Sequence, residues 1–258
     1  MPETTLRTND VGFRYGERWI FRNVNISIAS GTITNLLGAN GAGKSTLLSL
    51  CAGITAPTHG TVTSTGEIGF VPQATAGVFP YTVFDMVLMG RARKLGMFAQ
   101  PGSEDYRVTA NALERVGLLH VASSPFLRLS GGQQQLVLIA RALATECQTL
   151  ILDEPVSALD LHNQALVLQL LADLKAEGMA VMLSTHSPEH ALHLGGQTLV
   201  LGSTGTVHAG RTHSLLNDEV LSDLYRIDLF RHTIPDGNRS REVLVTRYES
   251  VHQQEKDS

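Results

Sequence analysis

The 258-residue sequence has few cysteines and no long apolar run, which argues against several classes of protein. Its only cysteines, Cys51 and Cys147, lie far apart in apolar segments and have no CxxC spacing. This argues against a disulfide framework or a thiolate zinc site, and it predicts two free, buried thiols in a reducing compartment. No apolar run reaches the roughly 18 residues that a membrane-spanning helix needs. Residues 1–10 are polar, so we expect no secretory signal there.

The sequence also lacks a strong charge of one sign. Lys and Arg number 20 against 24 Asp and Glu, which gives a net charge of -4. Nucleic-acid-binding domains usually carry a basic face, so we expect no nucleic acid partner. The one short basic run, Arg91, Arg93 and Lys94, is interpreted either as a solvated helix end or as a contact with a partner. Hydrophobic residues make up 43% of the chain, which is ordinary for a globular protein with a full core.

Apolar segments with strand and helix periodicity alternate along the chain, which predicts an α/β fold with a parallel sheet. The runs 150–152 and 181–183 are apolar throughout, as is typical of strands covered on both faces. We expect one domain over 1–230, interrupted by a helical insertion over about 83–145. A polar extension, 231–258, follows, and we expect its last ten residues to be disordered and 243–245 to pack partially. Strands are expected at 11–15, 23–28, 32–37, 60–63, 68–72, 149–152 and 180–184 and near Leu199 and Val207, and helices at 44–52, 131–143, 161–175 and 188–194.

A glycine-rich loop between a predicted strand and a predicted helix fits the pattern G-x-x-x-x-G-K-[ST]. Glycines let the backbone approach phosphates closely, and the N–H groups at a helix start point toward them. Lys44 is expected to neutralise the β- and γ-phosphates, and the Ser45 hydroxyl to complete a Mg²⁺ shell. ATP and Mg²⁺ are therefore the expected ligands. The residues of this loop that we expect to bind them are Gly38, Asn40, Gly41, Gly43, Lys44, Ser45 and Thr46.

Two carboxylates end the apolar run 150–152. Asp153 is expected to hold Mg²⁺ directly or through water, and Glu154 to polarise the attacking water as a general base. In open α/β sheets, ligands bind beyond the carboxyl ends of the strands, where both motifs end. The alternative is that Asp153, Glu154 and Pro155 only cap the next helix.

A second candidate phosphate-binding segment, 129–133, starts the predicted helix 131–143 with the sequence LSGGQ. With the phosphate loop and the acidic pair in this order, the chain resembles the ABC ATPase family, whose signature is LSGGQ, up to about residue 210. The resemblance implies a P-loop NTPase core with a parallel sheet, an N-terminal antiparallel β-subdomain and an inserted α-helical subdomain. It also implies that ATP is hydrolysed to drive transport.

The resemblance assigns further roles. Tyr15 resembles the aromatic residue that stacks on adenine, although a core tyrosine is the alternative. Gln73 resembles the glutamine that touches Mg²⁺ and water and senses the transmembrane partner. His186 resembles the histidine that contacts the γ-phosphate and orients the water. The residues implied to bind a nucleotide across a dimer interface are Ser130, Gly131, Gly132, Gln133 and Asp160.

A metal site is a rival interpretation of His186, because His190 and His193 follow at spacings that metal ligands can have. However, Pro188 predicts that the helix begins after His186, so the three need not share a face. We therefore expect His190 and His193 to be exposed helix residues.

The segment 87–91, with 95–98 and 105–106 after it, resembles importers for iron chelates, haem, cobalamin and molybdate. Within this group an iron chelate is the first expectation for the cargo, and molybdate or tungstate the second. The implied partners are a second copy in a head-to-tail ATP sandwich, two transmembrane permease subunits and, indirectly, a periplasmic or extracellular substrate-binding protein. The implied location is the cytoplasmic face of the cell membrane. A soluble ABC ATPase acting on DNA or ribosomes and a small-molecule kinase are the alternative classes.

Overall fold

The computed structural model describes residues 3–73, 80–95, 99–202, 204–237 and 239–248. Its centre is a six-stranded sheet with the order β5-β6-β7-β3-β8-β9. Neighbouring strands from β5 to β8 run parallel, and β9 pairs antiparallel with β8. Every residue of β3, β6 and β7 is buried, which confirms the expectation of strands covered on both faces. The strands are β3 (Ile33–Gly38), β5 (Ile68–Val71), β6 (Thr149–Leu152), β7 (Ala180–Ser184), β8 (Gln197–Leu201) and β9 (Val207–Arg211).

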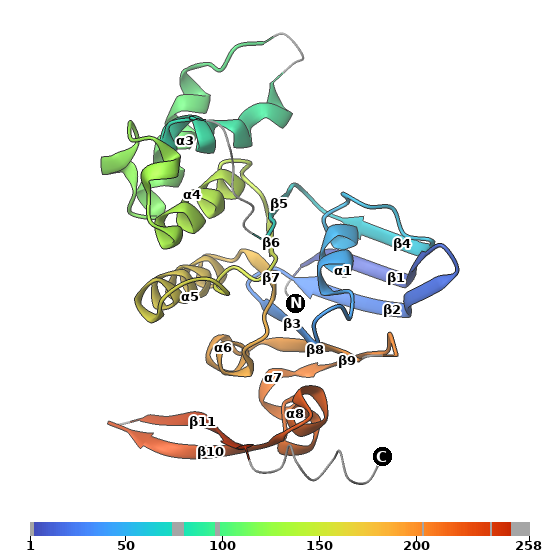
Figure 1. The fold of residues 1–258 in the computed structure, drawn as a ribbon. Coiled ribbons are helices and arrows are strands. Elements are labelled where there is room, and N and C mark those ends of the chain that lie inside the picture. The colour runs from blue at the N-terminus through green and yellow to red at the C-terminus, as the bar shows by residue number, and fades with distance from the viewer. Residues whose placement is uncertain (1–2, 74–79, 96–98, 203, 238, 249–258) are drawn as a thin grey trace.

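A separate antiparallel sheet with the order β2-β1-β4 lies beside this core (Figure 1). It consists of β1 (Thr4–Tyr15), β2 (Arg18–Ala29) and β4 (His59–Ser64). The first two strands are longer than the sequence pattern predicts. Register shifts interrupt the β1–β2 ladder, and Asp10 and Asn23 have positive φ, so the alternation of apolar residues is broken part-way along each strand.

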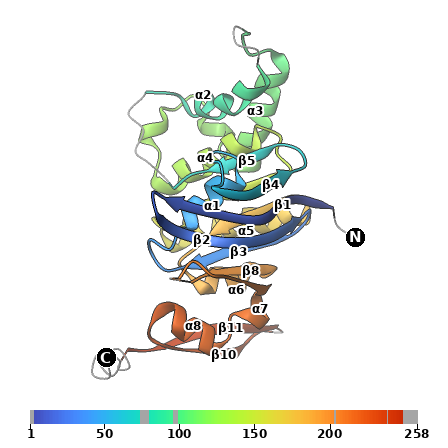
Figure 2. The same ribbon diagram turned by 90° about the vertical axis from the view of Figure 1, so that its right-hand side faces the viewer.

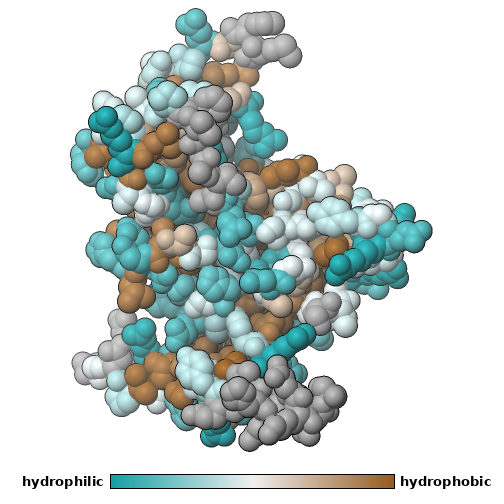
Figure 3. All heavy atoms as spheres, in the orientation of Figure 1, coloured by the Kyte–Doolittle hydropathy of each residue, from teal (hydrophilic) through white to brown (hydrophobic). Residues whose placement is uncertain are grey.

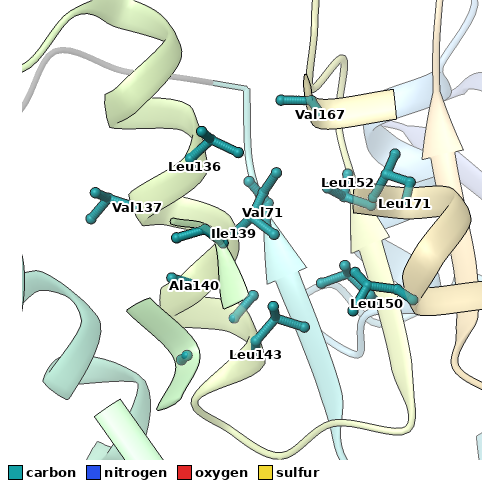
Figure 4. Packing of buried hydrophobic residues seen from close by; sticks show 14 of the residues in the cluster. Val71, Leu136, Val137, Ile139, Ala140, Leu143, Leu150, Leu152, Val167 and Leu171 are labelled. Atoms are coloured by element: carbon teal, nitrogen blue, oxygen red, sulfur yellow. The ribbon is translucent and has the colours of Figure 1, made fainter. Parts of the chain in front are cut away.

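Helices cover the two faces of the central sheet. On one face, α1 (Lys44–Cys51) shares a hydrophobic cluster with Ile151 and Met182. On the other face, α4 (Gly131–Leu143) and α5 (Leu161–Ala176) pack on Val71, Leu150 and Leu152 (Figure 4). The alternating residues of β6 therefore belong to different clusters, which places α1 and α4 on opposite faces of the sheet.

The inserted segment is helical and ends with α4. The elements before α4 are, in order, α2 (Val83–Leu88), η1 (Met89–Lys94), α3 (Ser103–Arg115) and two short 3₁₀ turns, η2 (Leu119–Val121) and η3 (Phe126–Arg128). Both interpretations of the basic run were wrong for Arg91. Its side chain is buried between Asp105 and Glu146, at 2.9 and 2.7 Å, and also bonds the carbonyl of Ala144. Residues 96–98, part of the importer resemblance, lie outside the described residues.

The remaining elements gather at the β8–β9 edge of the sheet (Figures 1 and 2). The expected boundary at 231 falls inside a β-hairpin, β10–β11. Leu244 of that hairpin packs on the cluster around Leu221 and Leu229, while Val245 is exposed. The expectation for 249–258 lies outside the described residues. These elements are α6 (Pro188–Leu194), α7 (Thr212–Leu215), α8 (Asp218–Tyr225), β10 (Asp228–Asp236) and β11 (Arg239–Arg247).

Polar and apolar residues are interspersed over the face of the molecule seen in Figure 3. Within the described ranges, no helix has the length and apolar character needed to cross a bilayer.

Candidate nucleotide-binding and hydrolysis site

The phosphate loop joins β3 to α1. Gly43, the N-cap of α1, has φ 106°, and a Cβ there would lie 2.4 Å from Cγ2 of Ile20. Both the conformation and the contact therefore require glycine. The buried Lys44 folds back over the loop, and its Nζ donates hydrogen bonds to the carbonyls of Gly38 (2.9 Å) and Ala39 (3.3 Å). The ammonium thus lies at the mouth of the loop, where a phosphate can replace the carbonyls.

The acidic pair lies at the end of β6, beside the end of β7. Asp153 is buried, and its Oδ1 accepts a hydrogen bond of 2.6 Å from the hydroxyl of Ser184. The same hydroxyl accepts a 2.8 Å bond from the backbone N–H of Glu154. Glu154 has φ +47°, a left-handed conformation that is uncommon for a residue other than glycine and often marks a functional site. Ser184 thereby fixes both carboxylate residues, a role that the sequence analysis missed.

Three predicted site residues come together around the Glu154 carboxylate. Its Oε1 lies 3.7 Å from Nζ of Lys44, and its Oε2 lies 3.6 Å from Nδ1 of His186. The three residues follow different strands, β3, β6 and β7, which are neighbours in the sheet. The carboxyl edge of the sheet therefore brings a cation, a carboxylate and an imidazole within reach of one small ligand group.

The predicted signature segment starts α4 with a reciprocal capping box. Gln133 N–H donates to the Ser130 hydroxyl, and Ser130 N–H donates to Oε1 of Gln133. Ser130 and Gly131 are exposed, whereas a Cβ at Gly132 would lie 2.2 Å from Cγ of Asn163. This contact joins the signature segment to the start of α5.

Asp160 is the N-cap of α5. Its Oδ1 accepts hydrogen bonds from the backbone N–H (2.8 Å) and the side-chain amide (2.9 Å) of Asn163. These bonds, the backbone one first, lower the pKa of the Asp160 carboxyl. Asp160 is exposed beside Leu161, which is 82% exposed. The structure brings Asp160 close to the signature segment through Asn163.

The other predicted residues lie at the surface. Tyr15 is 62% exposed and meets Phe13 edge to face at 4.9 Å, so the alternative of a core tyrosine is wrong. Gln73 is exposed just after β5. In the described part of the chain, no hydrogen bond or ion pair joins Tyr15, Gln73 or Ser130 to Lys44.

The histidines of the rival metal interpretation differ in their surroundings. His193 is exposed as expected, but His190 is half-buried, because the next residues of α6, Ala191 and Leu192, pack into a hydrophobic cluster. Burial lowers the pKa of His190, and its Nδ1 has no partner among the described residues. Within those residues, no three His, Cys, Asp or Glu side chains are grouped as a metal could require.

Comparisons with known proteins identify the family of the chain. The sequence pattern of the ABC transporter family matches residues 21–157, more than half of the chain. The chain belongs to this family. It is therefore an ABC ATPase, as the resemblance implied.

Individual relatives match over nearly their whole length. The molybdate import ATP-binding protein MolC of Haemophilus influenzae is 44% identical over 87% of this chain and 89% of its own. The iron(3+)-hydroxamate import ATP-binding protein FhuC of Bacillus subtilis is 33% identical over 91% of this chain and 93% of its own. The relatives of this ABC ATPase thus include ATP-binding subunits of importers for both expected kinds of cargo.

Solved structures confirm the fold. A putative metal-chelate type ABC transporter in an inward-facing conformation superposes with a TM-score of 0.91 at 40% identity, covering 96% of this chain and all of that one. A dimeric ATP-binding cassette in a post-hydrolysis state, bound to ADP and phosphate, gives 0.68 at 28% identity, covering 80% and 98%. The predicted combination of a P-loop NTPase core, an antiparallel β-subdomain and an inserted helical subdomain is confirmed.

Proposed function

We propose that this ABC ATPase holds ATP on the phosphate loop and hydrolyses it with Glu154 as the general base. The observation that supports this most directly is the convergence of Lys44, Glu154 and His186 at one edge of the sheet. Lys44 balances the charge of the β- and γ-phosphates, and Glu154 takes a proton from the attacking water. His186 contacts the γ-phosphate and orients that water. Tyr15, exposed on β1, stacks on the adenine.

The residues expected to hold Mg²⁺ fit that ion. Mg²⁺ is usually bound by one or two carboxylates together with substrate phosphates and water. Asp153 supplies a buried carboxylate with its Oδ1 already oriented by Ser184, and Ser45 and Gln73 supply neutral oxygens. Bound there, the ion would neutralise charge on the β- and γ-phosphates.

The positions of α1 and α4 favour a head-to-tail dimer. They pack on opposite faces of the sheet, so the phosphate loop and the signature segment of one chain begin helices on different faces. In the dimer, the segment 130–133 and Asp160 of one copy meet the ATP held by Lys44 of the other. The γ-phosphate then bridges the two copies until hydrolysis removes it.

We place this dimer at the cytoplasmic face of a membrane, against two permease subunits that receive cargo from a substrate-binding protein. Gln73 and the inserted helices form the proposed contact with the permease. Of the two cargo classes, the comparisons favour a molybdate-like oxyanion, because identity to the molybdate relative is 44% against 33% for the iron-hydroxamate one. A metal chelate is the second candidate, named by the solved transporter at 40% identity.

Trapping the dimer tests the mechanism. Glu154→Gln should keep ATP binding but lower the hydrolysis rate by ~100-fold or more, so that ATP converts the protein to a dimer by size-exclusion chromatography with light scattering. The matched control is Glu177→Gln, which changes an exposed glutamate at the C-cap of α5. This variant should hydrolyse ATP at the wild-type rate. A Glu154→Gln protein that remains monomeric in ATP contradicts the sandwich.

The cargo is tested in the assembled transporter, with its permease and binding protein in liposomes. ATPase activity should rise when the binding protein is loaded with molybdate, and not when it is loaded with an iron hydroxamate. If only the iron hydroxamate raises ATPase activity, the metal chelate is the cargo. If neither ligand raises it, both cargoes are rejected.

A further inference from the structure

The last residue of α8 reaches the loop that carries His186. The phenol oxygen of Tyr225 donates a hydrogen bond of 2.8 Å to the backbone carbonyl of His186, 39 residues earlier in the chain. This contact joins the C-terminal segment to the candidate hydrolysis site.

His186 lies in the short connection between β7 and α6. On the C-terminal side, the N–H of Ser187 donates to the hydroxyl of Thr185 at 3.0 Å, which closes a tight turn around His186. The imidazole is 53% exposed, and apart from Glu154 Oε2 at 3.6 Å no hydrogen bond or ion pair to it is found in the described chain. A fixed carbonyl restricts the backbone angles that set where this side chain points, so the Tyr225 bond limits the imidazole's range.

Helix α8 is itself held firmly. Asn217 caps its first turn, and Leu221 is fully buried against the sheet edge. The Ser222 hydroxyl accepts a 3.0 Å bond from the N–H of Leu229, and Asp218 accepts a 2.9 Å bond from the N–H of Arg231. The hairpin therefore fixes the helix that presents the phenol.

The phenol is suited to be a permanent donor. Burial raises the pKa of Tyr225 well above its ordinary value, so the hydroxyl keeps its proton at neutral pH. A backbone carbonyl has no proton to donate, so the direction of the bond is fixed.

We propose that Tyr225 is a positioning residue for ATP hydrolysis: through the His186 carbonyl, α8 holds the imidazole where it meets the γ-phosphate. This inference rests on the proposed function of His186. The C-terminal helix and hairpin then contribute to turnover through the His186 loop, and the loop stays ordered before ATP arrives.

The test uses the full-length protein with Tyr225→Phe, which removes only the hydroxyl. The expected kcat for ATP is lowered about 5- to 30-fold, the order expected for one lost positioning hydrogen bond, while KM and the affinity for ADP stay within about two-fold. Tyr248→Phe, which loses the same atom from a side chain that is 75% exposed, is the matched control and should match wild type.

Hydrogen exchange measured without nucleotide distinguishes positioning from general destabilisation. In Tyr225→Phe, amides at 185–187 should exchange faster while those of β7 keep their protection. An unchanged kcat, or faster exchange spread over β7, overturns the proposal. The parallel variant His186→Ala tests the proposed function separately: if it retains wild-type kcat, the role of His186 fails, whereas the exchange result still reports whether the tether exists.

Discussion

Ser184 ends β7 and Asp153 directly follows the neighbouring strand β6, and the two share a buried hydrogen bond of 2.6 Å, donated by the hydroxyl to Oδ1 of the carboxylate. Because the same hydroxyl accepts the N–H of Glu154, one small side chain orients both acidic residues. The carboxylates proposed for Mg²⁺ and for the water are therefore positioned by the sheet, and not only by the loop that follows them.

Removing this hydroxyl should reduce activity. Ser184→Ala removes the hydroxyl that donates to the buried Asp153 carboxylate and accepts from the N–H of Glu154. We therefore expect kcat to fall about ten-fold and the free energy of unfolding to fall by ~1–3 kcal/mol. ATPase assays and urea unfolding measure the two effects. The matched control is Thr149→Val on β6, where the buried hydroxyl has no partner among the described residues. That variant should be neutral or slightly stabilised; an equal loss in both variants would contradict a specific role for Ser184.

Lys44 is expected to be essential for nucleotide binding. Lys44→Ala removes the ammonium at the mouth of the loop, so binding of a fluorescent ATP analogue should weaken by ~10-fold or more and turnover should be lost. Lys175→Ala, in the last turn of α5, serves as the control. Unchanged ATPase activity in Lys44→Ala would rule out the site.

Arg91 should matter for stability more than its neighbour Arg93. Arg91→Ala leaves Asp105 and the carbonyl of Ala144 without a buried partner, so we expect the free energy of unfolding to fall by ~2–3 kcal/mol. Arg93 is 75% exposed, and its guanidinium lies 3.9 Å from Glu67, so Arg93→Ala should cost less than ~0.5 kcal/mol. If urea unfolding gives the same loss of stability for Arg91→Ala and Arg93→Ala, the buried network contributes no more than an exposed ion pair.

The same network predicts a pH dependence. Hydrogen bonds from Arg91 lower the pKa of Asp105, and those from Lys94 and Arg91 lower the pKa of Glu146. In the unfolded chain both carboxyls have pKa values near 4, and in the folded protein both pKa values are lower. The stability that the two ionised carboxylates contribute is therefore present at neutral pH and is lost as the pH falls through the folded pKa values. The destabilisation caused by Arg91→Ala should therefore shrink between pH 7 and about pH 3. A difference that stays constant over this range would contradict the assignment.

The sequence by itself determined the family and the core strands, and it predicted the residues of the candidate site. Its motifs are local: a phosphate loop or an acidic pair needs only a few adjacent residues between a strand and a helix, so 38–46 and 153–154 were recognisable. The strands β6 and β7 were equally recognisable, because a strand that is buried on both faces is a continuous apolar run without alternating polar residues.

The tertiary structure decided what depends on contacts between distant segments. Arg91 looked like a surface residue because nothing adjacent shows that Asp105 and Glu146 converge on it. A polar residue ending an otherwise apolar strand was a faint signal for Ser184, but no local pattern marks Tyr225, whose partner is 39 residues away. Local patterns fix the type of element and the motif, whereas the partner of a buried polar group is set by which strands and helices become neighbours, and only folding establishes that.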